Sequence, residues 1–155
     1  MIVEPKAILK PEWFKDPEGV HGINHAIRVG ILVAKLSTEI GLPIEYREAL
    51  SWVAMWHDIG RDHDGECDLH GFASVDKAIS LGLLNDFDFI SAEIICYVMA
   101  YHCVDERYAH AIADADTKHC DPNLLKRSLS VFRDSDALDV IRVKPLEQSR
   151  LRFLV

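Results

Sequence analysis

The chain has 155 residues, of which 49% are hydrophobic and 27% charged, a composition typical of a single globular domain. Its formal net charge of −8 argues against a protein that binds a nucleic-acid duplex through a basic surface. The first residues lack the apolar run of a secretory signal, and no stretch has the length of a membrane span. We therefore expect a cytoplasmic protein without membrane contact.

Helical periodicity runs through the first third of the chain. Apolar residues recur at three- and four-residue steps over residues 22–40, and Gly41 and Pro43 then indicate the end of a helix. A second helix is predicted from about Ile44 to Trp56, with acidic residues near its start, where they suit the helix dipole. The polar residues 60–69 form a predicted loop.

Further helices are predicted beyond this loop. One begins near His70 and ends by Gly82, and the next runs from about Asp86 to Tyr101, with Asp86 or Asp88 as its N-cap. A short helix could lie over residues 108–115. The last helix opens at Asp121-Pro122, because proline fits a first helical position, and continues through Ile141. Since strand alternation is not evident, the expected fold class is all-α.

The four cysteines form no C-x-x-C pair, and no secretory signal precedes them. Free cysteine is among the most buried residue types, so we expect reduced thiols that act as small, partly buried side chains. They are Cys67, Cys96, Cys103 and Cys120.

The most informative feature of the sequence is the polar pair His57-Asp58, which ends the strongly apolar run of residues 49–56. Unpaired polar groups are costly in apolar surroundings, so this pair needs partners. A divalent metal would supply them. With His25 upstream and Asp136 downstream, the pair forms a set of two imidazoles and two carboxylates that suits a first-row transition metal.

Three motifs resemble those of the HD-domain phosphohydrolases. The chain reads H-G-I-N-H-A-I-R-V at 21–29, H-D-I-G-R at 57–61 and D-S-D-A-L-D at 134–139, where the superfamily has a His, a His-Asp pair and a distant Asp, all on helices. The resemblance covers about residues 20–142. It implies a bundle of five or more helices around a buried metal site whose ligands are His25, His57, Asp58 and Asp136.

The resemblance also chooses between neighbouring candidates. It selects His25 over His21, because His25 is the His of the H-x-x-R-V motif, and it leaves His21 near the site. It selects Asp136 over Asp134 and Asp139, because the ligand Asp of the superfamily lies three residues before the last acidic or His residue of its motif.

Residues beside these ligands could orient them. Asp134 and Asp139 are expected either to contact the ligands or to lie on the helix surface, and Arg28 and Arg142 are candidates for orienting contacts.

His70 and His102 leave the number of metal ions open. Some branches of the superfamily add two His at corresponding places and bind two metals, which here would make both residues ligands. In the alternative, one metal binds the first four ligands, and His70 and His102 face the substrate. The short loop between the His-Asp pair and His70 makes the match to the two-metal pattern imperfect.

Other residues could help the reaction. Arg61 follows Gly60 beside the site, and its planar guanidinium suits a phosphate group, although it could also be a solvated loop charge. Lys77 is a further candidate for offsetting phosphoryl charge. The proton for a leaving oxygen could come from His70, His102 or Asp62.

The leading hypothesis is a metal-dependent phosphohydrolase, either a phosphomonoesterase or a phosphodiesterase. Its substrate would be a small anionic phosphate ester such as a nucleotide, a dinucleotide or a phosphorylated metabolite, attacked by a metal-activated water. We expect one or two divalent ions of Mn, Fe, Co, Ni or Zn, with Mg as an option, and catalytic roles for Asp58, Arg61, His70 and His102. The alternatives are an HD-fold di-iron oxygenase with the same ligands and a non-catalytic metal- or ligand-binding module.

We expect residues 1–155 to form one HD-type domain, with residues 143–155 as a tail. The tail alternates basic and apolar residues. It could dock on the domain or on a second subunit in a homodimer, or it could be the start of a longer chain.

Overall fold

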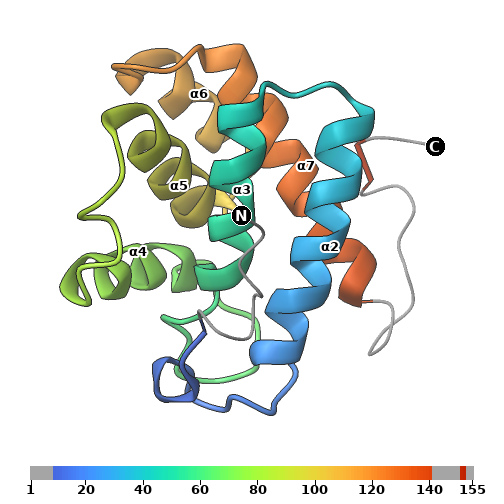
Figure 1. Cartoon of the computed structure of the whole chain (residues 1–155), viewed down its shortest axis with the longest axis vertical. Coiled ribbons are helices and arrows are strands. Elements are labelled where there is room, and N and C mark those ends of the chain that lie inside the picture. The colour runs from blue at the N-terminus through green and yellow to red at the C-terminus, as the bar shows by residue number, and fades with distance from the viewer. Residues whose placement is uncertain (1–8, 141–150, 153–155) are drawn as a thin grey trace.

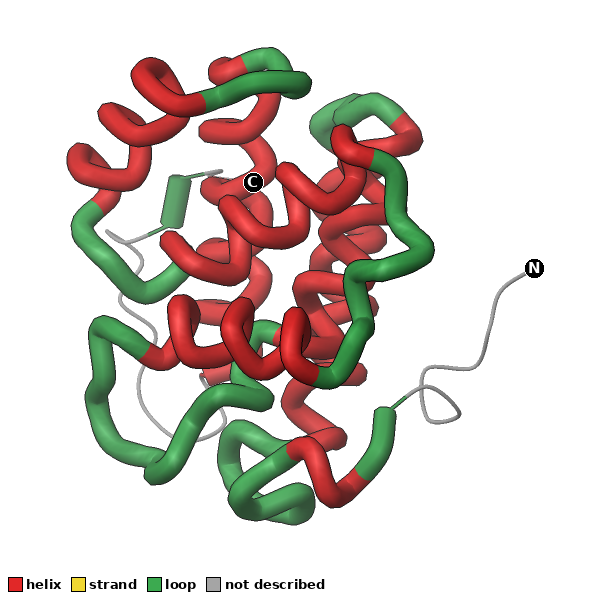
Figure 2. Tube along the Cα trace, turned by 90° about the vertical axis from the view of Figure 1, so that its left-hand side faces the viewer, coloured by secondary structure: helices red, strands yellow, loops and turns green. Residues whose placement is uncertain are grey.

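The computed structural model describes residues 9–140 and 151–152, and within these residues the backbone consists of helices and loops without strands (Figures 1 and 2). The all-α prediction is confirmed. The elements are the 3-10 turn η1 (Pro11–Trp13) and the α-helices α2 (Ile23–Glu39), α3 (Ile44–Trp56), α4 (His70–Ser80), α5 (Phe89–Tyr101), α6 (Glu106–Asp116) and α7 (Pro122–Val140).

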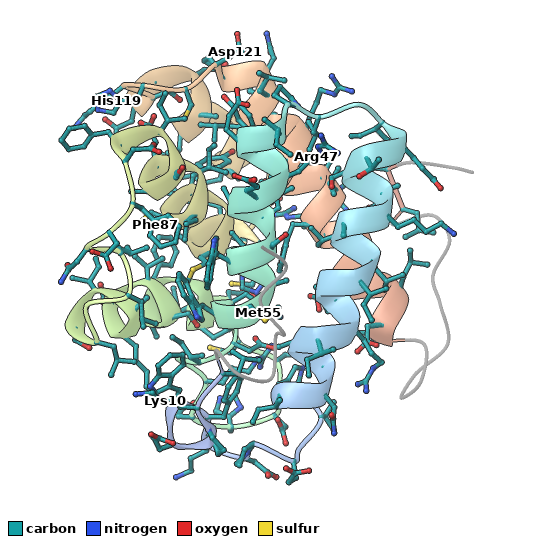
Figure 3. All side chains as sticks on the ribbon, viewed as in Figure 1. Lys10, Arg47, Met55, Phe87, His119 and Asp121 are labelled. Carbon is teal, nitrogen blue, oxygen red and sulfur yellow. The ribbon has the colours of Figure 1, made fainter. Side chains whose placement is uncertain are left out.

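Helix α3 lies at the centre of the bundle, between α2 and α5, and also contacts α7 (Figure 1). Leu50, Val53 and Ala54 are completely buried, and Met55, labelled in Figure 3, lies near the end of α3 that leads into the site. A helix that is apolar around most of its circumference belongs in a core. The residues that directly follow α3 are therefore delivered into the interior.

The helix boundaries differ from the predicted ones by a few residues at most. Gly41 has a φ of +68°, a left-handed conformation that favours glycine after a helix C-terminus, and it ends α2 as expected. Of the two predicted caps of α5, Asp88 is the one that acts, because its carboxylate accepts a hydrogen bond from the Ser91 amide at 2.8 Å. The turn η1 was not predicted.

Two glycines allow α4 to approach its neighbours closely. A Cβ on Gly60 would lie 2.2 Å from the Ser74 amide nitrogen in α4, and a Cβ on Gly71 would lie 2.3 Å from the Met99 carbonyl oxygen in α5. Ser74 Oγ also accepts a hydrogen bond from the Gly60 amide at 2.9 Å and donates one to the His57 carbonyl at 2.6 Å. These contacts fix the start of α4 against the end of α3 and the end of α5.

The remaining predictions concern the thiols, the membrane and the C-terminal residues. All four cysteines are free and half-buried. None of the helices in the described residues is both long and apolar enough to cross a membrane. Ile141, Arg142 and most of the predicted tail lie outside the described residues. Arg152 is described, and its side chain contacts Asp134 on α7 and Glu106 on α6.

Candidate metal centre

Four of the side chains selected from the sequence converge between α2, α3 and α7. His25 comes from α2, His57 and Asp58 follow α3, and Asp136 comes from α7. His25 Nε2 lies 3.1 Å from His57 Nε2, 3.4 Å from Asp58 Oδ2 and 3.2 Å from Asp136 Oδ1. Atoms at such separations can share one ion at about 2.0–2.2 Å, the usual metal–ligand distance for N and O ligands. We call these four residues the first cluster.

Hydrogen bonds determine which ring nitrogens face the first cluster. His25 Nδ1 donates to Asp139 Oδ2 at 2.6 Å, and His57 Nδ1 donates to the Ala54 carbonyl oxygen at 3.0 Å. In a neutral imidazole the other nitrogen, Nε2, then carries a lone pair. With both imidazoles neutral, the rings direct lone pairs at the carboxylate oxygens of the cluster and at each other, an arrangement that requires either a shared proton or a metal ion.

One oxygen of Asp58 gives independent evidence that the residues fit a metal. Asp58 is only 4% exposed, and its buried Oδ2 makes no well-aligned hydrogen bond among the described residues, although His57 Nε2 lies at 3.2 Å and His25 Nε2 at 3.4 Å. A buried carboxylate oxygen without compensation is strongly unfavourable. A divalent cation among the first-cluster atoms would provide that compensation.

His70 and His102 form a second pair on the other side of Asp58. Their Nε2 atoms lie 2.8 Å apart, and His70 Nε2 lies 3.2 Å from Asp58 Oδ1. Their Nδ1 atoms donate to the carbonyl oxygens of Cys67 at 2.6 Å and Met99 at 2.7 Å, so both Nε2 atoms carry lone pairs here as well. We call His70, His102 and Asp58 Oδ1 the second cluster. The Asp58 carboxylate thus presents one oxygen to each cluster.

A family model for the HD domain matches residues 22–140, most of the chain and all of both clusters. The chain belongs to the HD domain family. HD domains are generally metal-dependent phosphohydrolases, and the His and Asp clusters of this chain fit that chemistry. No curated protein and no solved structure matches the chain.

The carboxylates of this HD domain change the pKa values of the buried imidazoles. Burial alone would lower the pKa of His25 and His70, but hydrogen bonds to Asp136 and Asp58 raise the pKa of His25 to about 10, and the Asp58 carboxylate raises that of His70 to about 10. Burial and the neighbouring imidazoles lower the pKa of His102 to about 3. Each cluster without metal therefore holds an extra proton at neutral pH.

We expect the metal-free protein to become less stable as the pH rises from about 6.5 to 10. His25 and His70 have a pKa of about 10 when folded and an ordinary value of 6.5, so the folded chain binds protons that the unfolded chain releases. This stabilisation is full below pH 6.5 and is lost as the pH passes through the folded-state value. Metal binding should reverse the trend, because a metal competes with these protons.

Thermal unfolding between pH 6 and 9 measures this effect, with one series in a chelator and one in Zn²⁺. The melting temperature should fall with pH in the chelator and hold or rise in Zn²⁺. Parallel pH profiles in the two series would contradict the assignment of the protons to the clusters.

Asp139 and Arg28 hold His25 in place. Asp139 Oδ2 accepts the His25 Nδ1 hydrogen bond, and Oδ1 accepts one from Arg28 Nε at 2.6 Å. Asp139 is 6% exposed, so it orients the imidazole rather than lying on the helix surface. Asp134 is buried too, but it contacts Arg152 at the other end of this acidic motif.

Replacing Asp139 with asparagine should weaken metal binding at the first cluster by about 10–100-fold, the usual effect of losing an orienting carboxylate. The second cluster should keep its affinity, because neither His70 nor His102 contacts Asp139. A competition titration with a fluorescent zinc chelator measures both affinities. Asp114→Asn is the control, since Asp114 is an exposed carboxylate paired with Lys126 on the surface. Equal weakening at both clusters would show a general loss of structure instead.

A small cavity connects Asp58 with the solvent. Its volume is about 40 Å³, more than the roughly 10–15 Å³ that a single water requires. Sequence reasoning placed His21 near the site but missed several other cavity residues, because their positions carry no motif and they come together only through folding. The lining consists of Phe14, Lys15, Asp16, His21, Asp58, Arg61, His63 and Asp64.

Two hydrogen bonds fix the position of the Arg61 side chain. Its Nε donates to Asp58 Oδ1 at 2.7 Å, and its Nη1 donates to the Gly65 carbonyl oxygen at 3.0 Å. The side chain is 13% exposed, which argues against a solvated loop charge. The guanidinium therefore holds Asp58 and also contributes a positive charge to the cavity.

Two of the auxiliary candidates do not line the cavity. Lys77 Nζ donates to the Trp13 carbonyl oxygen at 2.6 Å, because α4 directs this side chain towards η1. Asp62 is 87% exposed and lies 3.4 Å from His63. These positions do not support Lys77 as a partner of the phosphoryl oxygens or Asp62 as the proton donor, two candidate roles that stay untested.

Proposed function

We propose that this HD domain is a phosphohydrolase that binds two divalent ions and hydrolyses a small phosphate ester. The observation that carries the proposal is the position of Asp58, whose two oxygens each face a buried pair of imidazole lone pairs. This geometry favours the two-ion alternative over a single ion. The proposed ligands are His25, His57, Asp58 and Asp136 for one ion and Asp58, His70 and His102 for the other.

The ions, when bound, supply an activated water and offset negative charge on the phosphoryl oxygens. The chain supplies the positioning. Asp58 ties the two clusters together, and Arg61, through its bond to Asp58, keeps a cation fixed at the inner end of the cavity. Preorganised charge of this kind stabilises a transition state without further rearrangement.

The cavity lining supports a small anionic substrate. Lys15 and Arg61 line the cavity together with the carboxylates of Asp16, Asp58 and Asp64, so an anionic group would depend on the proposed metal ions as well as on these two cations. The cavity volume of about 40 Å³ suits a phosphoryl group, with the remainder of the ester extending towards solvent. His21 and His63 also line the cavity, and an imidazole in this position is a candidate for proton exchange with a leaving oxygen.

Metal analysis combined with two hydrolysis assays tests this proposal. The metal content of unchelated protein is measured, and hydrolysis of bis(p-nitrophenyl) phosphate and p-nitrophenyl phosphate is followed before chelation, after it, and after metal is restored. Near two ions per chain and metal-restored hydrolysis would support the proposal. One ion with full activity would overturn the two-ion assignment. Bound iron without hydrolysis would point to an oxygenase, and a folded protein that binds no metal would contradict the proposed function.

A further inference from the structure

The second cluster has one more potential ligand beside it. Cys103 directly follows His102 at the end of α5, and its Sγ lies within 4.8 Å of ring nitrogens of both His70 and His102. It also donates a weak hydrogen bond to the Asp68 carbonyl oxygen, at 3.3 Å, so the thiol is held between the loop before α4 and the end of α5. Cys103 is half-buried, close to the cluster but reachable from solvent.

The second cluster by itself requires either a shared proton or a metal ion between its two imidazoles. His70 and His102 are 5% and 8% exposed, and their Nε2 lone pairs meet at 2.8 Å because both Nδ1 atoms are committed to carbonyl oxygens. Two imidazoles and one oxygen of Asp58 give three ligand atoms. A tetrahedral site needs a fourth, and thiolate sulfur is a common one in mixed His and Cys sites.

We propose that Cys103 is a thiolate ligand of the ion in the second cluster. This inference rests on the proposed two-ion function. Metal–nitrogen and metal–sulfur distances of about 2.0 and 2.3 Å place the two ligand atoms roughly 3.5 Å apart. In the structure Cys103 Sγ lies no more than 4.8 Å from the ring nitrogens of His70 and His102. The sulfur therefore has to move towards the imidazoles by at most about 1.3 Å. On metal binding the thiol releases its proton to solvent and exchanges the weak hydrogen bond to Asp68 for a metal–sulfur bond.

A thiolate would make the two clusters chemically different. The first cluster offers nitrogen and oxygen ligands alone, whereas the second would offer nitrogen, oxygen and sulfur. Sulfur ligands favour Zn²⁺, Fe²⁺ and Co²⁺ over the hard ions Mg²⁺ and Mn²⁺. The second cluster should therefore select a soft or borderline ion even when Mg²⁺ is in large excess.

Cobalt titration of the full metal-free chain tests this inference by absorption. Co²⁺ bound to a thiolate gives a near-ultraviolet sulfur-to-metal charge-transfer band that nitrogen and oxygen ligands do not give. The band should have the intensity of one thiolate, and Cys103→Ser should remove it while its visible cobalt bands and its helical circular dichroism remain. The second-cluster affinity of Cys103→Ser for Co²⁺ should fall by about 10–100-fold, whereas its Mg²⁺ affinity should change little.

Two other cysteines provide matched controls. Cys67 lies beside the same cluster, where its backbone carbonyl accepts the His70 hydrogen bond, and Cys96 lies on α5 away from it. Cys67→Ser and Cys96→Ser should both keep the band. Cobalt binding without the band, or with a band that persists in Cys103→Ser, would overturn the thiolate assignment and leave the two-ion centre standing. Failure of the folded chain to bind cobalt at all would overturn the metal centre itself.

Discussion

Replacing Asp58 with asparagine should lower kcat for phosphate ester hydrolysis by at least about 10³-fold, because the change removes charge from both clusters at once. Asp58 Oδ2 lies 3.4 Å from His25 Nε2, and Oδ1 lies 3.2 Å from His70 Nε2. Asparagine keeps the shape but offers one neutral oxygen and an amide group that donates hydrogen bonds. The metal content should fall from two ions per chain to one or fewer.

The substitution should spare the fold. The surrounding core is formed by apolar side chains of α3, α5 and α7 and keeps the helices together, although the loss of the carboxylate that pairs with Arg61 and the imidazoles should lower the stability. Circular dichroism and the metal content should therefore separate loss of the site from loss of structure.

Asp62→Asn is the matched control for Asp58→Asn. It makes the same chemical change four residues along the chain, at a side chain that is 87% exposed and outside the cavity lining. Its kcat and metal content should equal those of the unaltered protein. If the Asp58→Asn protein kept two ions and more than a tenth of the activity, Asp58 would not be a ligand on which hydrolysis depends.

The position of this carboxylate follows from features that are visible in the sequence. The apolar run of residues 49–56 predicts a buried helix, and a buried helix carries the next residues, His57 and Asp58, into the core. Periodicity, caps and proline positions likewise predicted five of the six α-helices in the described residues, and α6 was only an open possibility over residues 108–115. Helices depend on local sequence patterns, so their positions could be predicted without knowledge of the tertiary packing.

Directions of individual side chains were harder to predict. Lys77 and Asp62 are close to the site in sequence, but the first points to η1 and the second to solvent. Lys15 and Asp64 reach the cavity from segments without a motif. Periodicity assigns a residue to a face of a helix, whereas these positions depend on loop conformations and on how the loops fold back over α2 and α4.

The role of His70 in the second cluster also could not be predicted from the sequence. His70 lies only a short loop beyond Asp58, so sequence spacing alone left its role open. In the structure His70 Nε2 lies 2.8 Å from His102 Nε2, because the absence of a side chain at Gly71 lets α4 pack closely against α5. Close helix packing at a glycine is a tertiary property, and a lone H-G dipeptide does not reveal it.

Replacing Gly71 with alanine should therefore destabilise the protein by roughly 2–3 kcal/mol, the upper part of the range for overpacking in a core. A Cβ at this position would lie 2.3 Å from the Met99 carbonyl oxygen and 2.7 Å from the Ala100 carbonyl oxygen. Both are backbone atoms of α5, so the clash can be relieved only if one helix shifts away from the other. For a domain of this size, the melting temperature should fall by about 4–12 °C. The shift of α4 away from α5 should also weaken metal binding at the second cluster more than at the first.

Gly30→Ala makes the same substitution where space permits it. Gly30 lies inside α2, and its added Cβ would meet Met55 Cε at 3.5 Å, an ordinary van der Waals contact. Alanine is favoured over glycine in a helix interior by about 1 kcal/mol, so this variant should be as stable as the unaltered protein or more stable. Urea unfolding of the metal-free proteins measures both changes. If Gly71→Ala matched Gly30→Ala in stability, then helix propensity alone would govern both sites, and the close approach of α4 to α5 would not be what brings His70 to His102.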